Sequence, residues 1–215
     1  MKIKLEHVTK SFKGIEIIKD VSITFESGNI YGLIGKNGSG KSVFLKMLCG
    51  FYFPTSGSIY YNDDKLDVKN DFPKNTRALI ENPDFIPELT GYENLKLLAD
   101  IQNKIGDTQI FEALKVVNLF DEKDKKYSKY SLGMKQKLGI AQVIMEDPEV
   151  MIFDEPLNGI ESDTAIKLRK FFIEQKKAGK LIIVASHIKD DINLLCDTVY
   201  KFENGKISYE ENKWI

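Results

Sequence analysis

The chain has 215 residues, which is enough for one large domain or for a domain with a smaller subdomain. Its 42% hydrophobic and 29% charged residues are ordinary for a soluble globular protein, and a net charge of −1 does not favour bulk nucleic-acid binding. The N-terminus lacks the apolar block of a signal peptide, and no run approaches the roughly 18 uncharged apolar residues of a membrane span. We therefore expect a cytoplasmic protein that reaches a membrane only through a partner.

The first 80 residues have the pattern of strands with one helix. β-rich, partly alternating sequence predicts strands at residues 2–8, 16–26, 30–35 and 58–62. A helix is expected over 41–49, and Gly50 is suited to end it. Cys49 in this helix and Cys196 later in the chain stand in apolar runs, so we expect buried thiols and not a disulfide or a metal pair.

From about residue 88 to residue 146 the pattern becomes helical. Thr90 and Glu93 form a capping box before one helix, a second helix starts at Asp107, and a third starts near Leu132. The charged stretch 121–130 between the last two helices is typical of solvated surface.

The remaining sequence alternates strands with helices. The apolar runs 150–153 and 181–185 lack alternation, as parallel strands buried on both faces do. A helix is predicted at 162–177 between them, and Asn204-Gly205 predicts a closing hairpin. Together these patterns predict an α/β core with a β-rich beginning and a helical insert.

A phosphate-binding loop is the clearest motif. Residues 35–42 carry the pattern Gly-x-x-x-x-Gly-Lys-Ser between an apolar strand and a helix, which is the context that a P-loop requires. Lys41 is expected to reach the β- and γ-phosphates of a nucleoside triphosphate, and the Ser42 hydroxyl is expected to ligate Mg²⁺. The nucleotide-binding residues predicted in and beside this loop are Gly35, Lys36, Asn37, Gly38, Ser39, Gly40, Lys41, Ser42 and Val43.

Ionisable residues follow the two buried strands. Asp154 fits an acid that holds Mg²⁺ through water, and Glu155 would orient or deprotonate a water that attacks the γ-phosphate. A solvated strand end is the alternative, which the P-loop disfavours. His187 follows the second strand, where it could contact the γ-phosphate or the attacking water, although a structural role is commoner for such a histidine.

A second possible anion site lies at residues 130–141. Ser131 can cap the helix that starts there, and Gly133 would let another group approach its first turn. Since the chain already contains a P-loop, this second site needs its own explanation.

The order of these motifs resembles the nucleotide-binding subunit of ABC transporters over essentially the whole chain. The family's Leu-Ser-Gly-Gly-Gln signature is replaced by the residues from Tyr130 to Met134, of which Ser131 and Gly133 match. His187 matches the family's switch histidine. Phe12 matches the aromatic residue that stacks on adenine, with a place in the core as its alternative role.

This resemblance implies a P-loop NTPase (RecA-like) fold with an N-terminal antiparallel β subdomain. It divides the single domain 1–215 into a nucleotide-binding core, at 1–86 and 147–215, and a helical subdomain at about 87–146. It also implies ATP and Mg²⁺ as cofactors, ATP hydrolysis, and a dimer with itself or a paralogous ATPase subunit. In that dimer Ser131, Gly133 and Met134 would face the ATP held by the other subunit.

The resemblance further implies a separate integral membrane permease subunit as partner, no nucleic acid, and a place on the cytoplasmic face of the cell membrane. Phe85, Ile86 and Leu89 would line a groove for that partner or belong to the local core. Three alternatives stay open: a soluble P-loop kinase, a non-transport ABC ATPase acting on ribosomes or DNA, and a protein that senses ATP without turnover.

Glu81 departs from the family, which normally has a Mg²⁺-binding glutamine there. Direct ligation of Mg²⁺ by Glu81, with Ser42 and Asp154, would make the added charge tolerable. Glu81 and the sequence YSLGMKQ resemble the branch for export of, or immunity to, peptide antibiotics, lantibiotics and bacteriocins. We therefore expect export of a peptide, antibiotic or other amphipathic substrate. Members of that branch often have a longer C-terminal region, whereas the sequence here ends with residues 212–215, which leaves little room for a regulatory domain.

Overall fold

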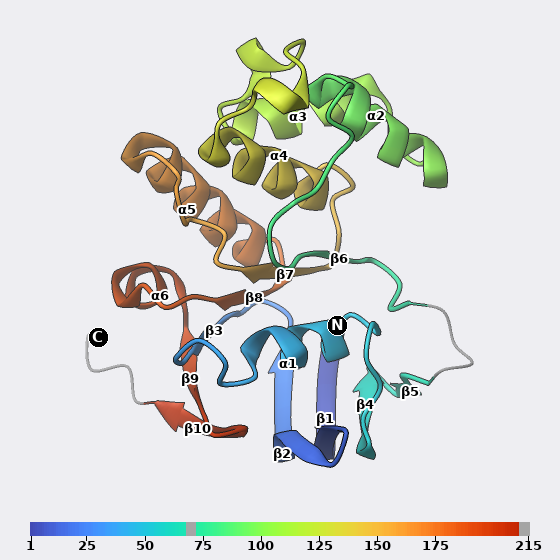
Figure 1. The fold of residues 1–215 in the computed structure, drawn as a ribbon, viewed down its shortest axis with the longest axis vertical. Helices are drawn as coiled ribbons and strands as arrows, with labels where there is room; N and C mark the ends of the chain where they lie inside the picture. The colour runs from blue at the N-terminus through green and yellow to red at the C-terminus, as the bar shows by residue number, and fades with distance from the viewer. Residues whose placement is uncertain (68–71, 211–215) are drawn as a thin grey trace.

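The structure, a computed structural model, describes residues 1–67 and 72–210. The expectation about the C-terminal end at 212–215 lies outside the described residues. A six-stranded sheet with the strand order β10-β9-β3-β8-β7-β6 occupies the middle of the molecule (Figure 1). All of its neighbours are parallel except the β9–β10 hairpin. Its strands are β3 (Ile30–Ile34), β6 (Thr76–Leu79), β7 (Val150–Asp154), β8 (Leu181–Ala185), β9 (Thr198–Glu203) and β10 (Lys206–Glu210).

The central strands are buried on both faces, as their unbroken apolar sequence predicts. Every residue of β7 and β8 is buried. Because successive side chains of a strand point to opposite faces, Met151 and Phe153 pack into one core and Val150 and Ile152 into another. The sheet therefore separates two hydrophobic cores.

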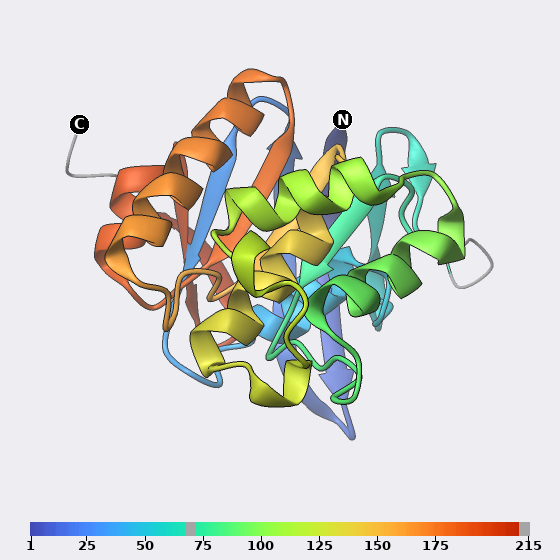
Figure 2. The same ribbon diagram turned by 90° about the horizontal axis from the view of Figure 1, so that it is seen from above.

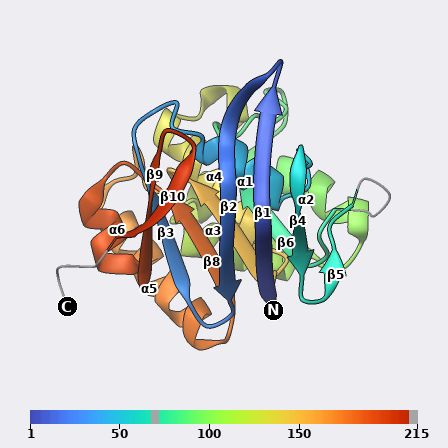
Figure 3. The same ribbon diagram turned by 90° about the horizontal axis from the view of Figure 1, so that it is seen from below.

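The first core lies between the central sheet and an antiparallel sheet of order β2-β1-β4-β5, which Figure 3 shows from below. Helix α1 (Lys41–Leu48) lies between the two sheets and contributes Phe44 and Leu45 to that core (Figure 1). The antiparallel strands are β1 (Lys2–Phe12), β2 (Ile15–Glu26), β4 (Ser56–Tyr61) and β5 (Asp64–Lys65). The predicted strands and the end of α1 before Gly50 are confirmed, whereas the two-residue strand β5 was not predicted.

The second core lies on the opposite face of the central sheet, which the remaining helices cover (Figure 2). These helices are α2 (Gly91–Gln102), α3 (Asp107–Val116), α4 (Leu132–Ile144), α5 (Ser162–Lys177) and α6 (Lys189–Leu195), with 3-10 turns at Phe120–Glu122 and Tyr127–Lys129. The predicted capping box of Thr90 and Glu93 forms, and both of its hydrogen bonds are present. Helix α6 was not predicted, since seven residues carry little periodicity.

The predicted fold class, an α/β P-loop NTPase with an antiparallel β part and inserted helices, is confirmed. The inserted helices share a single core with the sheet, because Leu95 and Leu138 pack in the same cluster as Phe153. The subdomain boundaries at 87 and 146 stay a prediction. Both cysteines are buried, as predicted. In the part of the chain that the structure describes, no helix is long and apolar enough to cross a membrane.

Candidate functional site

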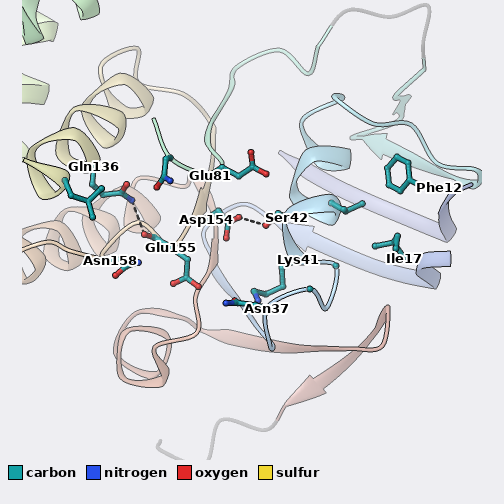
Figure 4. Close-up of a pocket in the computed structure, with 15 residues that line it drawn as sticks. Phe12, Ile17, Asn37, Lys41, Ser42, Glu81, Gln136, Asp154, Glu155 and Asn158 are labelled. Carbon is teal, nitrogen blue, oxygen red and sulfur yellow. Dashed lines mark hydrogen bonds between the residues drawn. The ribbon is translucent and has the colours of Figure 1, made fainter. Parts of the chain in front are cut away.

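The predicted phosphate-, Mg²⁺- and water-binding residues come together because they lie at the ends of neighbouring parallel strands. Strands β3, β8, β7 and β6 lie side by side, so their carboxyl ends meet at one edge of the sheet, where ligands bind in α/β folds. The glycine-rich loop follows β3, His187 follows β8, Asp154 ends β7 and Glu81 follows β6. A cavity of about 680 Å³ lies at this edge (Figure 4). It is lined by Phe12, Ile17, Asn37, Gly38, Gly40, Lys41, Ser42, Val43, Glu81, Asn82, Leu132, Gln136, Asp154, Glu155 and Asn158.

The glycine-rich loop has the features of a phosphate cradle. Gly40 precedes α1 with a φ of 109°, a conformation that favours glycine. Because glycine has no side chain, the first amides of the helix have no side-chain cap. The buried Lys41 donates from Nζ to the carbonyl oxygens of Gly35 at 2.7 Å and Lys36 at 3.3 Å. The buried Ser39 hydroxyl has no hydrogen-bond partner among the described residues. An anion in this loop would accept hydrogen bonds from the uncapped helix amides and from the Lys41 ammonium in place of the two carbonyls, so the residues present fit a nucleotide phosphate.

Ser42 and Asp154 join the loop to strand β7. The Ser42 hydroxyl donates to Asp154 Oδ2 at 2.7 Å, as Figure 4 shows. Burial raises the pKa of Asp154, and the hydrogen bond from Ser42 opposes this effect. Within residues 1–67 and 72–210, no three His, Cys, Asp or Glu side chains form a ready-made metal site. The pair nevertheless offers hard oxygen ligands of the kind that Mg²⁺ prefers when phosphates complete its coordination.

Glu155 and His187, which were predicted separately, are in contact. Glu155 Oε1 accepts a hydrogen bond from the His187 backbone N–H at 2.9 Å and lies 2.7 Å from His187 Nδ1. Its other oxygen, Oε2, accepts from the Ser186 hydroxyl at 3.0 Å. The backbone N–H of Glu155 donates to the Ala185 carbonyl at the end of β8. The end of β8 and the two residues that follow it therefore hold the carboxylate of the predicted base in place.

Glu81 lines the cavity, but its carboxylate is paired with a lysine. Lys46 Nζ donates to Glu81 Oε1 at 2.6 Å, and this hydrogen bond raises the pKa of Lys46. The Glu81 backbone has a φ of 66°, which is uncommon for a residue other than glycine. The predicted role of Glu81 as a Mg²⁺ ligand stays a prediction, and its partner Lys46 was not predicted.

Phe12 lies at one end of the cavity with Ile17, on the hairpin between β1 and β2 (Figure 4). It is 38% exposed and makes an edge-on contact with Tyr52, with a centroid distance of 5.3 Å. A place in the core, which was the alternative role of Phe12, is therefore wrong. An exposed ring on the cavity wall is compatible with the predicted stacking on adenine.

The start of α4 shows how the second predicted anion site is built. Ser131 Oγ accepts from the Met134 backbone N–H at 3.2 Å, which confirms the predicted cap. The Met134 side chain packs against the second core. A Cβ on Gly133 would lie 2.6 Å from the Gly159 carbonyl oxygen. The close approach that Gly133 permits is therefore made by the same chain.

Two side chains of α4 extend this contact along residues 155–161. Gln136 Nε2 donates to the backbone oxygens of Glu155 at 3.0 Å and Pro156 at 3.3 Å. The Lys137 ammonium pairs with Glu161 at 2.6 Å. Sequence reasoning missed Gln136, although it follows Leu132 by one helical turn and thus shares its face. Leu132 is 70% exposed and lines the cavity.

The groove residues predicted beside the helices have different environments. Phe85 packs edge-on against the Tyr127 ring at a centroid distance of 5.4 Å and belongs to the local core. Ile86 is 43% exposed. A role of this segment in binding a membrane subunit stays a prediction.

Comparison with known proteins identifies the family. The family model described as ABC transporter matches residues 18–158. The chain is 38% identical to an uncharacterised ABC transporter ATP-binding protein, YybJ of Bacillus subtilis, over 97% of this chain and 96% of that protein. It is 36% identical to the bacitracin transport ATP-binding protein BcrA of Enterococcus faecalis, over 98% of this chain and 69% of that protein. It is 32% identical to the lantibiotic transport ATP-binding protein SrtF of Streptococcus pyogenes, over 97% of this chain and 90% of that protein.

Solved structures agree on the fold. An ATP-binding subunit of an ABC transporter superposes with a TM-score of 0.88 at 25% identity, covering 98% of this chain and 90% of the other. A dimeric ATP-binding cassette in a post-hydrolysis state with ADP and phosphate superposes with a TM-score of 0.87 at 22% identity, covering 99% of this chain and all of the other. The predicted resemblance to the peptide-antibiotic branch agrees with the bacitracin and lantibiotic relatives, and the family excludes the P-loop kinase alternative. The chain belongs to the ABC transporter family, as one of its ATP-binding proteins, and it is an ATPase.

Proposed function

We propose that this chain is the ATP-hydrolysing subunit of an ABC exporter for a peptide, an antibiotic or another amphipathic substrate. The observation that carries the hydrolytic role is the meeting of Lys41, Ser42, Asp154 and Glu155 on one cavity wall. The relatives named for bacitracin and lantibiotic transport support the class of substrate.

The phosphate-loop residues and the acidic residues of the cavity then have separate tasks. The amides of residues 37–42 and the Lys41 ammonium bind the phosphates, and Phe12 lies against the adenine. Ser42 and Asp154 hold Mg²⁺, and Glu81 is available beside them. Bound Mg²⁺ supplies charge neutralisation at the phosphate oxygens.

Glu155 acts as the general base. Its carboxylate orients the attacking water and accepts its proton. The hydrogen bonds from Ser186 and from the His187 backbone fix the direction of the carboxylate before nucleotide binds. His187 Nδ1, which is 2.7 Å from the same carboxylate, leaves the other ring nitrogen to contact the γ-phosphate.

We propose that two copies, or this chain and a paralogous subunit, close around two ATP molecules. Ser131, Gly133 and Met134, at the start of α4, then face the γ-phosphate bound by the partner, where a helix N-terminus stabilises an anion by about 0.3–1 kcal/mol. The dimeric cassette with the same fold and the exposed Leu132 beside the cavity support this arrangement. A separate permease subunit would hold the dimer at the cytoplasmic face of the membrane.

Three measurements test the proposal. The purified chain is expected to release phosphate from ATP without an acceptor, and the Glu155→Gln variant is expected to sediment as a dimer only when ATP and Mg²⁺ are present. Purification of the tagged chain from solubilised membranes is expected to bring down one hydrophobic permease. A chain that hydrolyses ATP but is recovered with ribosomes or DNA, and without a membrane protein, would instead be a non-transport ABC ATPase.

A further inference from the structure

Two residues on one face of helix α1 form hydrogen bonds to Asp154 and Glu81, the two acidic residues of the predicted metal site. Ser42 and Lys46 are four residues apart and therefore lie on the same face of the helix. The Ser42 hydroxyl bonds Asp154 at 2.7 Å, and the Lys46 ammonium bonds Glu81 at 2.6 Å. The helix that begins in the phosphate loop thus has a separate partner for each carboxylate.

Glu81 adds a negative charge to a cavity that already holds Asp154 and Glu155. The Lys41 ammonium, in the phosphate loop, donates to the carbonyl oxygens of Gly35 and Lys36 and not to Glu81. Among the described residues, Glu81 lines the cavity and Lys46 does not. Lys46 contacts the site through its hydrogen bond to the Glu81 carboxylate.

The two partners of the ion pair differ in exposure. The Lys46 side chain is 24% exposed, and the Glu81 side chain is 62% exposed. Lys46 therefore has the more restricted position, and Glu81, which follows β6, has a positive φ. Lys46 can hold Glu81 at the rim of the cavity while leaving the carboxylate accessible to a cation.

We propose that Lys46 is a positioning residue for Glu81, which it holds at the cavity rim and whose charge it offsets beside the nucleotide phosphates. The inference rests on the proposed function, because it requires the cavity to bind ATP. Without Lys46 the uncompensated carboxylate repels a nucleotide that carries no Mg²⁺, and it attracts Mg²⁺ more strongly. Both effects require Glu81 to be charged, so they disappear when Glu81 is replaced by glutamine.

A double-mutant cycle on nucleotide binding without Mg²⁺ tests this coupling. The binding of a fluorescent ATP analogue in EDTA is measured for the wild type, Lys46→Gln, Glu81→Gln and the double variant. Lys46→Gln is expected to weaken binding about two- to fivefold, the range of a partly exposed ion pair. Glu81→Gln is expected to bind at least as tightly as the wild type, and the double variant is expected to equal Glu81→Gln. The Mg²⁺ concentration for half-maximal ATPase activity is expected to fall in Lys46→Gln alone.

Two further variants serve as controls. Lys176→Gln removes a lysine of α5 whose side chain is also 24% exposed. This lysine pairs with Asp197 at 2.7 Å, and neither residue lines the cavity. It is expected to leave nucleotide and Mg²⁺ binding unchanged. Lys46→Arg keeps the charge and is expected to bind nucleotide as the wild type does, with the same thermal midpoint.

The outcomes distinguish a failure of the role proposed for Lys46 from a failure of the proposed function. The proposal is overturned if Lys46→Gln weakens nucleotide binding equally in the wild-type background and in the Glu81→Gln background, because Lys46 would then act on the nucleotide itself. Unchanged nucleotide binding in Lys46→Gln would overturn it as well. If Lys46→Gln unfolds, Mg²⁺-free binding by Glu81→Gln that is at least as tight as that of the wild type still supports the proposal, and weaker binding refutes it. Failure of the wild type to bind ATP would instead refute the proposed function.

Discussion

Replacing Glu155 with glutamine tests the proposed general base with little disturbance of the fold. The glutamine Oε1 can still accept from the His187 backbone N–H, at the 2.9 Å that Glu155 shows. Its Nε2 can donate to the Ser186 hydroxyl, now 3.0 Å from the carboxylate, because a hydroxyl both donates and accepts. We therefore expect a thermal midpoint close to that of the wild type.

The expected loss is confined to the chemical step. An amide cannot take the proton of the attacking water, and a general base contributes about 10²- to 10⁴-fold to the rate. That loss equals about 3–5 kcal/mol in the activation free energy. Nucleotide binding should remain, because the contacts of Lys41 and Ser42 are intact.

The assay combines phosphate release with binding of a fluorescent ATP analogue. We expect Glu155→Gln to lower kcat at least about 100-fold and to leave nucleotide affinity within about twofold of the wild type. Glu203→Gln, the same substitution at an exposed ion-paired glutamate on β9, is the control and should keep wild-type turnover. Turnover of Glu155→Gln near the wild-type rate would show that another group activates the water.

Three further predictions concern α4 and the cysteines. Ser131→Ala removes the cap on Met134 N–H, so we expect the free energy of unfolding to fall by about 1 kcal/mol and the thermal midpoint to fall by about 2–4 °C. We also expect slower turnover, with ATP binding by the monomer retained. Loss of that binding would mean that the helix belongs to the phosphate cradle of its own subunit. Gly133→Ala puts a Cβ 2.6 Å from the Gly159 carbonyl oxygen, so we expect about 1–3 kcal/mol of destabilisation by chemical denaturation, and unchanged stability would mean that the 155–161 segment yields freely. Burial raises the pKa of Cys49 to about 12 and also raises that of Cys196, so Ellman's reagent should label the native protein slowly and the denatured protein fully.

The structure changes how substitutions at the start of α4 are interpreted. A side chain at Gly133 meets Gly159 of the same chain before it could meet a partner. Lost turnover in a Gly133→Asp variant would therefore not by itself demonstrate a contact with the partner's ATP. Ser131→Ala adds no atom against Gly159 and removes a hydroxyl at the exposed start of the helix, so its loss of turnover is compared with the loss of stability caused by removing the cap on Met134 N–H.

Much of the site could be predicted because its signals are local. The P-loop pattern depends on glycines that allow positive φ and on a lysine and a serine at fixed spacing in the same turn. The capping box at Thr90 involves residues three positions apart. Asp154 and His187 follow strands whose unbroken apolar sequence marks them as buried. Short elements such as α6 and β5 escaped because too few residues carry their pattern.

The sequence by itself determined the strand–loop–helix of the phosphate cradle, the acidic end of β7 and the family resemblance, since each depends on neighbours along the chain. Only the tertiary structure decided which side chains meet: Glu155 with His187, Glu81 with Lys46, and Gly133 with Gly159. These partners are 26–35 positions apart in the sequence. Their contact follows from the order of the parallel strands and from the packing of α1 and α4 on the sheet, which no local pattern specifies.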